Sequence, residues 1–293
     1  MPSMRKLRRV DVRSGAPTPT GAAQQGYLKR LENTYGDQLG PLQAGARSRR
    51  VSAYAEVAGA DELLDASVPC DRFAQLGTAV TALYTESIRS CNEPLLSRSG
   101  TVAIFSTEQP PLHPVGVADG DLQSFHTVHV PVDGHLVEMP TFEAKQEVLA
   151  RIHAGLCDLA HALDWPREPL QAAYQYCLER RLTYQWDGPA KFSPDRRHRA
   201  VPRFALTDEG CGRAVIEVRD QSGQTISSTG PLPAFPTIEG FRRAAKTLRW
   251  RDASTVSLVS YVRNPRDPSF ADTSRQPTEL HLPGPRPPAT PPR

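Results

Sequence analysis

The sequence has no long apolar run, and we expect it to carry no secretory leader. Nowhere do about 18 consecutive apolar residues occur, roughly the minimum for a membrane-spanning helix. The opening stretch MPSMRKLRRV leads into Asp11 and Arg13, where a signal peptide would carry its apolar segment. We therefore expect a cytoplasmic protein with no membrane contact. Because 39% of its 293 residues are hydrophobic and 23% are charged, we expect the chain to fold around a core.

Cysteine is scarce, odd in number and unpaired along the sequence. No CxxC pair occurs, and no histidine stands at zinc-finger spacing from a cysteine. This argues against a disulfide framework and predicts reduced cysteines that serve as packing residues. The cysteines are Cys70, Cys91, Cys157, Cys177 and Cys211.

Common catalytic and cofactor-binding motifs are also missing. GxSxG, the phosphate loop GxxxxGK[ST], GxGxxG and HExxH do not occur. Catalytic groups can still come together from distant positions, so an enzyme with such a site is one alternative. The sequence itself predicts no catalytic residue and no cofactor.

The histidine-rich stretch around residues 113–138 is the strongest candidate for a metal site. Asp133-Gly134 predicts a type I′ hairpin that pairs FHTVHVPV with HLVEMPT. In that hairpin His126 and His129 face opposite sides of the sheet, and His126 lies roughly 20 Å from the position opposite His135. Because metal–ligand bonds are near 2 Å, we predict no metal site here.

Charge and proline are unevenly distributed. Residues 1–50 carry ten Lys or Arg against three Asp or Glu, which predicts a basic, largely disordered arm. Residues 264–293 contain nine of the 28 prolines, which predicts a disordered Pro-rich tail. Residues 51–263 carry a net charge of −5 and are expected to hold the folded part. Arginine outnumbers lysine 30 to 5, a bias that suggests a bacterial origin.

Hydrophobic periodicity predicts an α+β fold. Apolar residues recur every three or four positions from 71 to 91, 142 to 165 and 237 to 250, as in amphipathic helices. Between them, β-branched and aromatic runs joined by short turns predict antiparallel meanders covered by the helices. The helix–meander–helix order occurs twice and suggests a duplicated unit. We expect one α+β unit at 51–165 and a second, packed on it, at 166–263.

Two groups of basic residues are candidate binding residues. Arg196, Arg197 and Arg199 lie in a loop that contains proline, and Arg242 and Lys246 lie on the polar side of the last helix. Such clusters neutralise phosphates, although a solvated helix face carries the same residues.

Two aromatic residues complete the candidate set. Tyr184 and Trp186 are two positions apart in a predicted strand and would share one of its faces. There they could stack on a base or a sugar, or pack in the core.

By elimination, the sequence favours a protein-interaction module without catalytic activity. This class includes adaptors, chaperone-like proteins and immunity-type binders, and the partner would meet the sheet face and the long loop at 108–123. The alternative is a nucleic-acid-binding protein that uses the basic arm and the Arg-rich segments 191–203 and 242–251. The net charge of −5 between residues 51 and 263 weakens long-range attraction to nucleic acid.

Overall fold

The computed structural model describes residues 5–14, 60–92, 94–97, 100–107, 115–118, 125–260 and 277–282. The chain forms two compact units. Unit 1 comprises Met1–Tyr184 together with Thr207–Gly210, and unit 2 comprises Gln185–Leu206 together with Cys211–Arg293. Both combine helices with β-sheet, so the predicted α+β class is confirmed.

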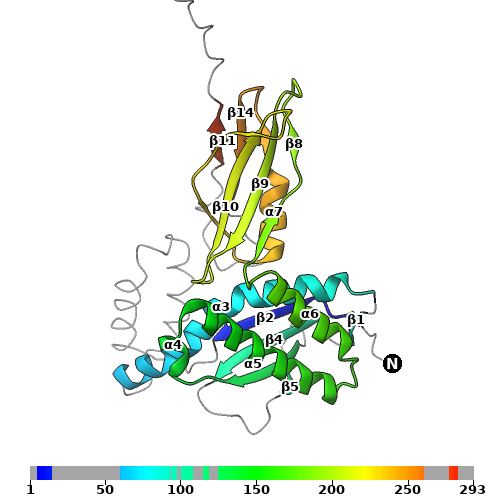
Figure 1. Ribbon diagram of the computed structural model, residues 1–293, viewed down its shortest axis with the longest axis vertical. Helices are drawn as coiled ribbons and strands as arrows, with labels where there is room; N and C mark the ends of the chain where they lie inside the picture. The colour runs from blue at the N-terminus through cyan, green and yellow to red at the C-terminus, as the bar shows by residue number, and fades with distance from the viewer. Residues whose placement is uncertain are drawn as a thin grey trace, which may run out of the picture. The chain divides into compact units, whose positions relative to one another are not determined.

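Unit 1 is built on a four-stranded sheet in the order β2-β4-β6-β5. Strands β2, β4 and β6 run parallel, and only β5 is antiparallel to its neighbour β6. Parallel neighbours need a crossover connection, and the long helix α3 provides it between β2 and β4 (Figure 1). The strands are β2 (Arg9–Ser14), β4 (Thr101–Thr107), β5 (Val115–Ala118) and β6 (Phe125–Pro131), and a small pair joins β1 (Arg5–Lys6) to β3 (Leu96–Ser97).

The described residues of unit 1 form four helices. Two glycines let α3 and α5 approach the sheet closely. A Cβ on Gly77 would lie 3.0 Å from Cγ2 of Val12 in β2, and one on Gly155 would collide with Cγ1 of Val128 in β6. Helix α3 begins well before the predicted residue 71 and contains Pro69. The helices are α3 (Ala60–Ser90), α4 (His135–Glu138), α5 (Thr141–Ala162) and α6 (Glu168–Glu179).

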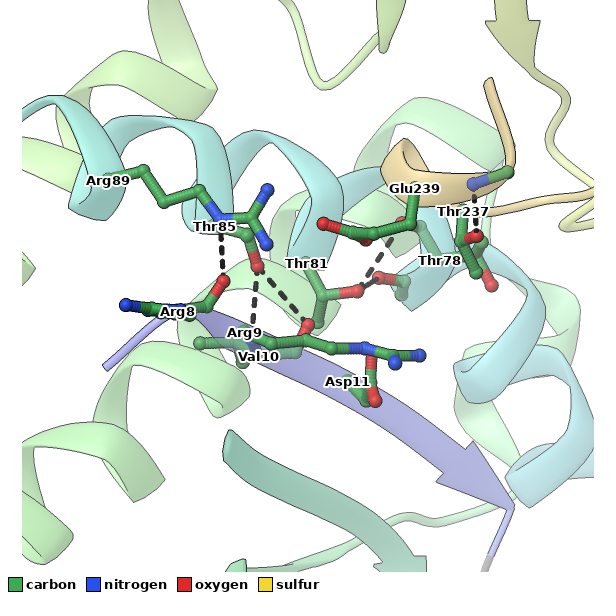
Figure 2. A network of polar contacts seen from close by, with 12 residues as sticks. Arg8, Arg9, Val10, Asp11, Thr78, Thr81, Thr85, Arg89, Thr237 and Glu239 are labelled. Atoms are coloured by element: carbon green, nitrogen blue, oxygen red, sulfur yellow. Dashed lines mark hydrogen bonds and ion pairs between the residues drawn. The ribbon is translucent and has the colours of Figure 1, made fainter. Parts of the chain in front are cut away.

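Polar contacts join α3 to the N-terminal strands (Figure 2). The Thr85 hydroxyl accepts a hydrogen bond from the backbone N–H of Val10 at 3.0 Å and lies 3.3 Å from its carbonyl oxygen. Nearby, Nε of Arg89 donates to the carbonyl oxygen of Arg8 at 2.6 Å. Because Val10 is itself buried, residues 9–14 are an integral part of this sheet.

Unit 2 is an antiparallel sheet with one helix, α7 (Ile238–Thr247), on one face (Figure 1). Thr237 caps this helix as its sequence position predicts, because its side chain accepts a hydrogen bond from Gly240 N at 3.0 Å (Figure 2). The sheet contains β7 (Gln185–Asp187), β8 (Lys191–Phe192), β9 (Arg199–Leu206), β10 (Gly212–Arg219), β11 (Thr225–Ser228) and β12 (Leu232–Ala234). A smaller sheet contains β13 (Arg249–Trp250), β14 (Thr255–Leu258) and β15 (Thr278–His281).

The predicted hairpin at Asp133-Gly134 is wrong. Gly134 has φ −64°, not the positive φ of a type I′ turn, and the residues after it form helix α4 instead of a strand. The Asp133 carboxylate accepts a hydrogen bond from His135 N at 3.0 Å and another from the Arg151 guanidinium at 3.2 Å. These contacts turn the chain into a helix, and β6 takes β4 and β5 as its neighbours.

The predicted division of the chain also differs from the structure. Helix α6 packs on α3 within unit 1, so the boundary falls between Tyr184 and Gln185 and not after residue 165. The two sheets have different topologies, one largely parallel and one antiparallel, which argues against a duplicated unit.

The predicted disordered ends contain ordered strands. Residues 9–14 of the basic arm pair with β4, and residues 278–281 of the Pro-rich tail pair with β14. Both segments contain alternating apolar side chains, and the number of prolines or charges in a segment does not reveal this alternation. Residues 1–4 and 15–50 of the arm, residues 264–276 and 283–293 of the tail, and the loop at 108–123 apart from β5 lie outside the described residues.

Candidate functional site

The two faces of the unit 2 sheet differ sharply. Phe204 of β9 stacks on Phe241 of α7 with 5.0 Å between ring centroids, so its face is the one that α7 covers. Side chains alternate along a strand, so the odd-numbered residues of β9 and β10 lie on the opposite face. No described helix of unit 2 covers this opposite face, which we call the open face. It carries Arg199, Val201, Arg203, Ala205, Arg213, Val215, Glu217 and Arg219.

Two arginines of the open face share one carboxylate. Arg203 donates to Glu217 at 2.7 Å and to Asp187 at 2.9 Å, and Arg219 donates to the other oxygen of Glu217 at 2.8 Å. Burial alone would raise the pKa of the Glu217 carboxyl, but the hydrogen bonds from the two arginines outweigh it and lower that pKa. The carboxylate therefore stays ionised and holds both guanidinium groups in place.

Arg199 on this face has no counter-ion among the described residues. It is half-buried, and within the described ranges its guanidinium makes no hydrogen bond or ion pair. Its register partners are Phe192 in β8 and Arg219 in β10, so the three side chains form one row across the sheet. Phe192 is 64% exposed. A half-buried cation without a counter-ion favours an anionic ligand.

The turn between β8 and β9 adds two more cations to this end of the sheet. Ser193 donates to the Asp195 carboxylate at 2.6 Å, and Arg197 N donates to the same oxygen at 3.1 Å. The first of these bonds is the main reason that the pKa of Asp195 is lowered. Arg196 has φ +57°, and both Arg196 and Arg197 are exposed. The turn is thus held by its own hydrogen bonds and presents two guanidinium groups to solvent.

Charge is divided between the units. The described residues of unit 2 contain twelve Lys or Arg and seven Asp or Glu, a net charge of +5. Those of unit 1 contain twelve Lys or Arg and sixteen Asp or Glu, a net charge of −4. The net charge of −5 summed over residues 51–263 hides this division. The expectation that negative charge weakens attraction to nucleic acid therefore does not apply to unit 2.

The structure gathers some of the predicted binding residues and separates others. Arg196, Arg197 and Arg199 lie together at the Phe192 end of the open face. Arg242 and Lys246 are exposed on α7, the layer that covers the other face, so they cannot share a site with Arg199 on one face.

Of the two possibilities for Tyr184 and Trp186, both side chains pack inside their units and form no exposed stacking platform. Tyr184 is 2% exposed and belongs to the core of unit 1. Trp186 pairs with Phe204 and stacks on it with 5.5 Å between ring centroids, on the α7 side of the unit 2 sheet. Among the described residues of unit 2, Phe192 is the exposed aromatic residue instead. The sequence carried no local signal for its exposure, because a two-residue strand shows no periodicity.

A second polar cluster joins three helices of unit 1. The Tyr84 hydroxyl donates to the carbonyl oxygen of Leu170 at 2.9 Å and lies 2.8 Å from Nδ1 of His153, so Nδ1 carries the proton and donates to Tyr84. Nε2 of His153 then faces Sγ of Cys157 at 3.6 Å.

This cluster has the layout of a nucleophile and its base, but its electrostatics oppose that role. Burial raises the pKa of the Cys157 thiol and lowers the pKa of His153. A reactive cysteine needs a lowered pKa, so we interpret the cluster as a satisfied polar core.

Within the described ranges, no group of three or more His, Cys, Asp or Glu side chains could hold a metal ion. His126 is buried beside Trp165, and neither of its ring nitrogens has a hydrogen-bond partner in the part of the chain that the structure describes. Burial lowers its pKa, so its ring is neutral at pH 7.

None of the described helices combines the length and the apolar composition needed to cross a lipid bilayer. No family model matches the chain, and neither the curated proteins nor the solved structures include a significant match.

Proposed function

We propose that this protein binds nucleic acid through the open face of unit 2. The observation that carries the proposal is Arg199, a half-buried guanidinium that has no anionic partner within the described residues and lies beside Arg219. A phosphate group would supply the missing charge and accept its hydrogen bonds. Bound nucleic acid would therefore lie across the strands at this end of the sheet.

The surroundings of Arg199 support the same ligand. Arg196 and Arg197 extend the row of cations at the adjacent turn, and the described residues of unit 2 carry a net charge of +5. Counter-ions released from several phosphates supply most of the affinity in such complexes, and this part of the binding is independent of sequence.

The test compares two single-charge variants of the full chain, Arg199→Ala and Arg242→Ala. Both remove one positive charge from unit 2, but Arg242 lies on α7, away from the open face. Anisotropy of a fluorescent oligonucleotide of mixed sequence gives the affinity at about 50 and 200 mM salt. We expect Arg199→Ala to weaken binding about fivefold and to reduce the salt slope by about one, and Arg242→Ala to change neither. Equal effects of the two variants, or no binding by the unchanged protein, would contradict the proposal.

A protein partner is the second candidate, and one observation favours it. Val137 and Phe142 are 43% and 51% exposed at the junction of α4 and α5 in unit 1. Exposed apolar side chains that lie close together are typical of protein-binding surfaces. Affinity purification of the full chain with and without nuclease separates the candidates. Partners that survive nuclease and are lost in Phe142→Ala would support a protein-binding function.

A further inference from the structure

The ring of Phe192 is the least expected feature of the open face. It is 64% exposed, more than any other large hydrophobic side chain among the described residues. Burying a phenylalanine ring stabilises a fold, so a ring held in solvent next to arginines forgoes a substantial stabilisation. Its place is fixed by the strand pairing of β8 with β9, because Phe192 lies opposite Arg199.

We propose that the open face binds single-stranded nucleic acid, with an unpaired base stacked on Phe192 and adjacent phosphates held by Arg199 and Arg219. This inference rests on the proposed function and names its substrate. Neighbouring strands are about 4.8 Å apart, so Arg199 lies roughly 5 Å and Arg219 roughly 10 Å across the sheet from Phe192. These spacings place the ring and the two cations within reach of one short stretch of a strand.

A single strand fits this row better than a duplex does. Aromatic side chains stack on bases that are free of a partner, and each such contact contributes measurably to single-strand affinity without sequence preference. In a duplex the bases are already stacked on one another, so only the arginines could contribute. The neighbouring acids do not oppose a strand at Arg199, because Glu217 is bound by Arg203 and Arg219 and Asp195 is bound within its turn.

The experiment measures binding of the full chain to a fluorescent mixed-sequence oligonucleotide, alone and annealed to its complement, at about 150 mM salt. We compare the unchanged protein with Phe192→Ala, Phe192→Tyr and the control Leu96→Ala, which removes another exposed large hydrophobic side chain, from unit 1. We expect the single strand to bind about tenfold more tightly than the duplex. Phe192→Ala should abolish that preference while leaving duplex binding unchanged, and Phe192→Tyr should retain it. Leu96→Ala should have no effect.

A second readout reports the contact directly. A photoreactive oligonucleotide that carries 5-iodouracil cross-links to an aromatic ring stacked on it, and the cross-linked peptide should contain Phe192. The inference is overturned if Phe192→Ala leaves the preference intact, or if polyglutamate displaces the strand at equal charge concentration. If the inference about Phe192 is overturned but Arg199→Ala still weakens duplex binding, the proposed function stands without the stacking contact. If neither nucleic acid binds, both fail.

Discussion

The two units build their sheets in different ways and expose different surfaces. Unit 1 places β2, β4 and β6 in parallel beneath long helices, so Val10, Ile104 and Val128 are almost fully buried. Within its described residues, unit 2 has one helix, and the face of its antiparallel sheet that α7 covers is the more deeply buried one. A parallel sheet requires helical crossovers, and these helices cover it, whereas antiparallel strands joined by turns can leave a face open. The open sheet is therefore the one able to offer a flat binding surface.

The largest expected effect separates the two faces of the unit 2 sheet. Phe204→Ala removes a fully packed ring between Trp186 and Phe241, and we expect a loss of about 3–5 kcal/mol in the free energy of unfolding. Phe192→Ala removes an exposed ring and should change stability by less than about 0.5 kcal/mol. Urea unfolding of both variants measures the difference. Similar losses would mean that the open face is covered.

The next effect tests the close helix–sheet packing of unit 1. Gly155→Val places a side chain where Val128 already lies, so we expect destabilisation of about 1–3 kcal/mol or more. Gly134→Ala is the matched control, because a Cβ there meets nothing within 4 Å and its φ is −64°. We expect the control to unfold like the unchanged protein. A large loss in Gly134→Ala would restore the tight hairpin that the sequence predicts.

The smallest effect concerns pH and the buried histidine of unit 1. Burial lowers the pKa of His126, so the unfolded chain takes up a proton on this side chain at a higher pH than the folded protein does. Stability from this group is present above the usual histidine range and is lost as the pH falls below it. We expect urea unfolding to become easier between about pH 7.5 and 5.5, and His126→Leu to reduce that change. If His126→Leu shows the same pH dependence of stability as the unchanged protein, that dependence comes from other groups, such as His153, whose pKa is also lowered.

The candidate site shows where sequence reasoning reached its limit. The charge cluster at Arg196, Arg197 and Arg199 could be identified because its members are neighbours in the chain. Grouping them with Arg242 failed, because strand pairing and helix docking place these residues in different layers of unit 2. Phe192 was overlooked because its exposure depends on where a two-residue strand joins the sheet edge.

Local patterns alone determined the α+β class, the helical stripes of α5 and α7, the cap at Thr237 and the alternation of β9 and β10. Each of these depends on neighbours within a few residues, where side-chain periodicity and capping act directly. Only the tertiary structure decided that the basic arm supplies β2, that Asp133-Gly134 leads into a helix, and that Arg199 lies in a row with Phe192 and Arg219. The physical reason is that these features depend on pairing between distant segments, as when β2 pairs with a strand about ninety residues later in the chain. A one-residue change of register in such a pairing moves every side chain of the strand to the opposite face of the sheet, and no local pattern fixes that register.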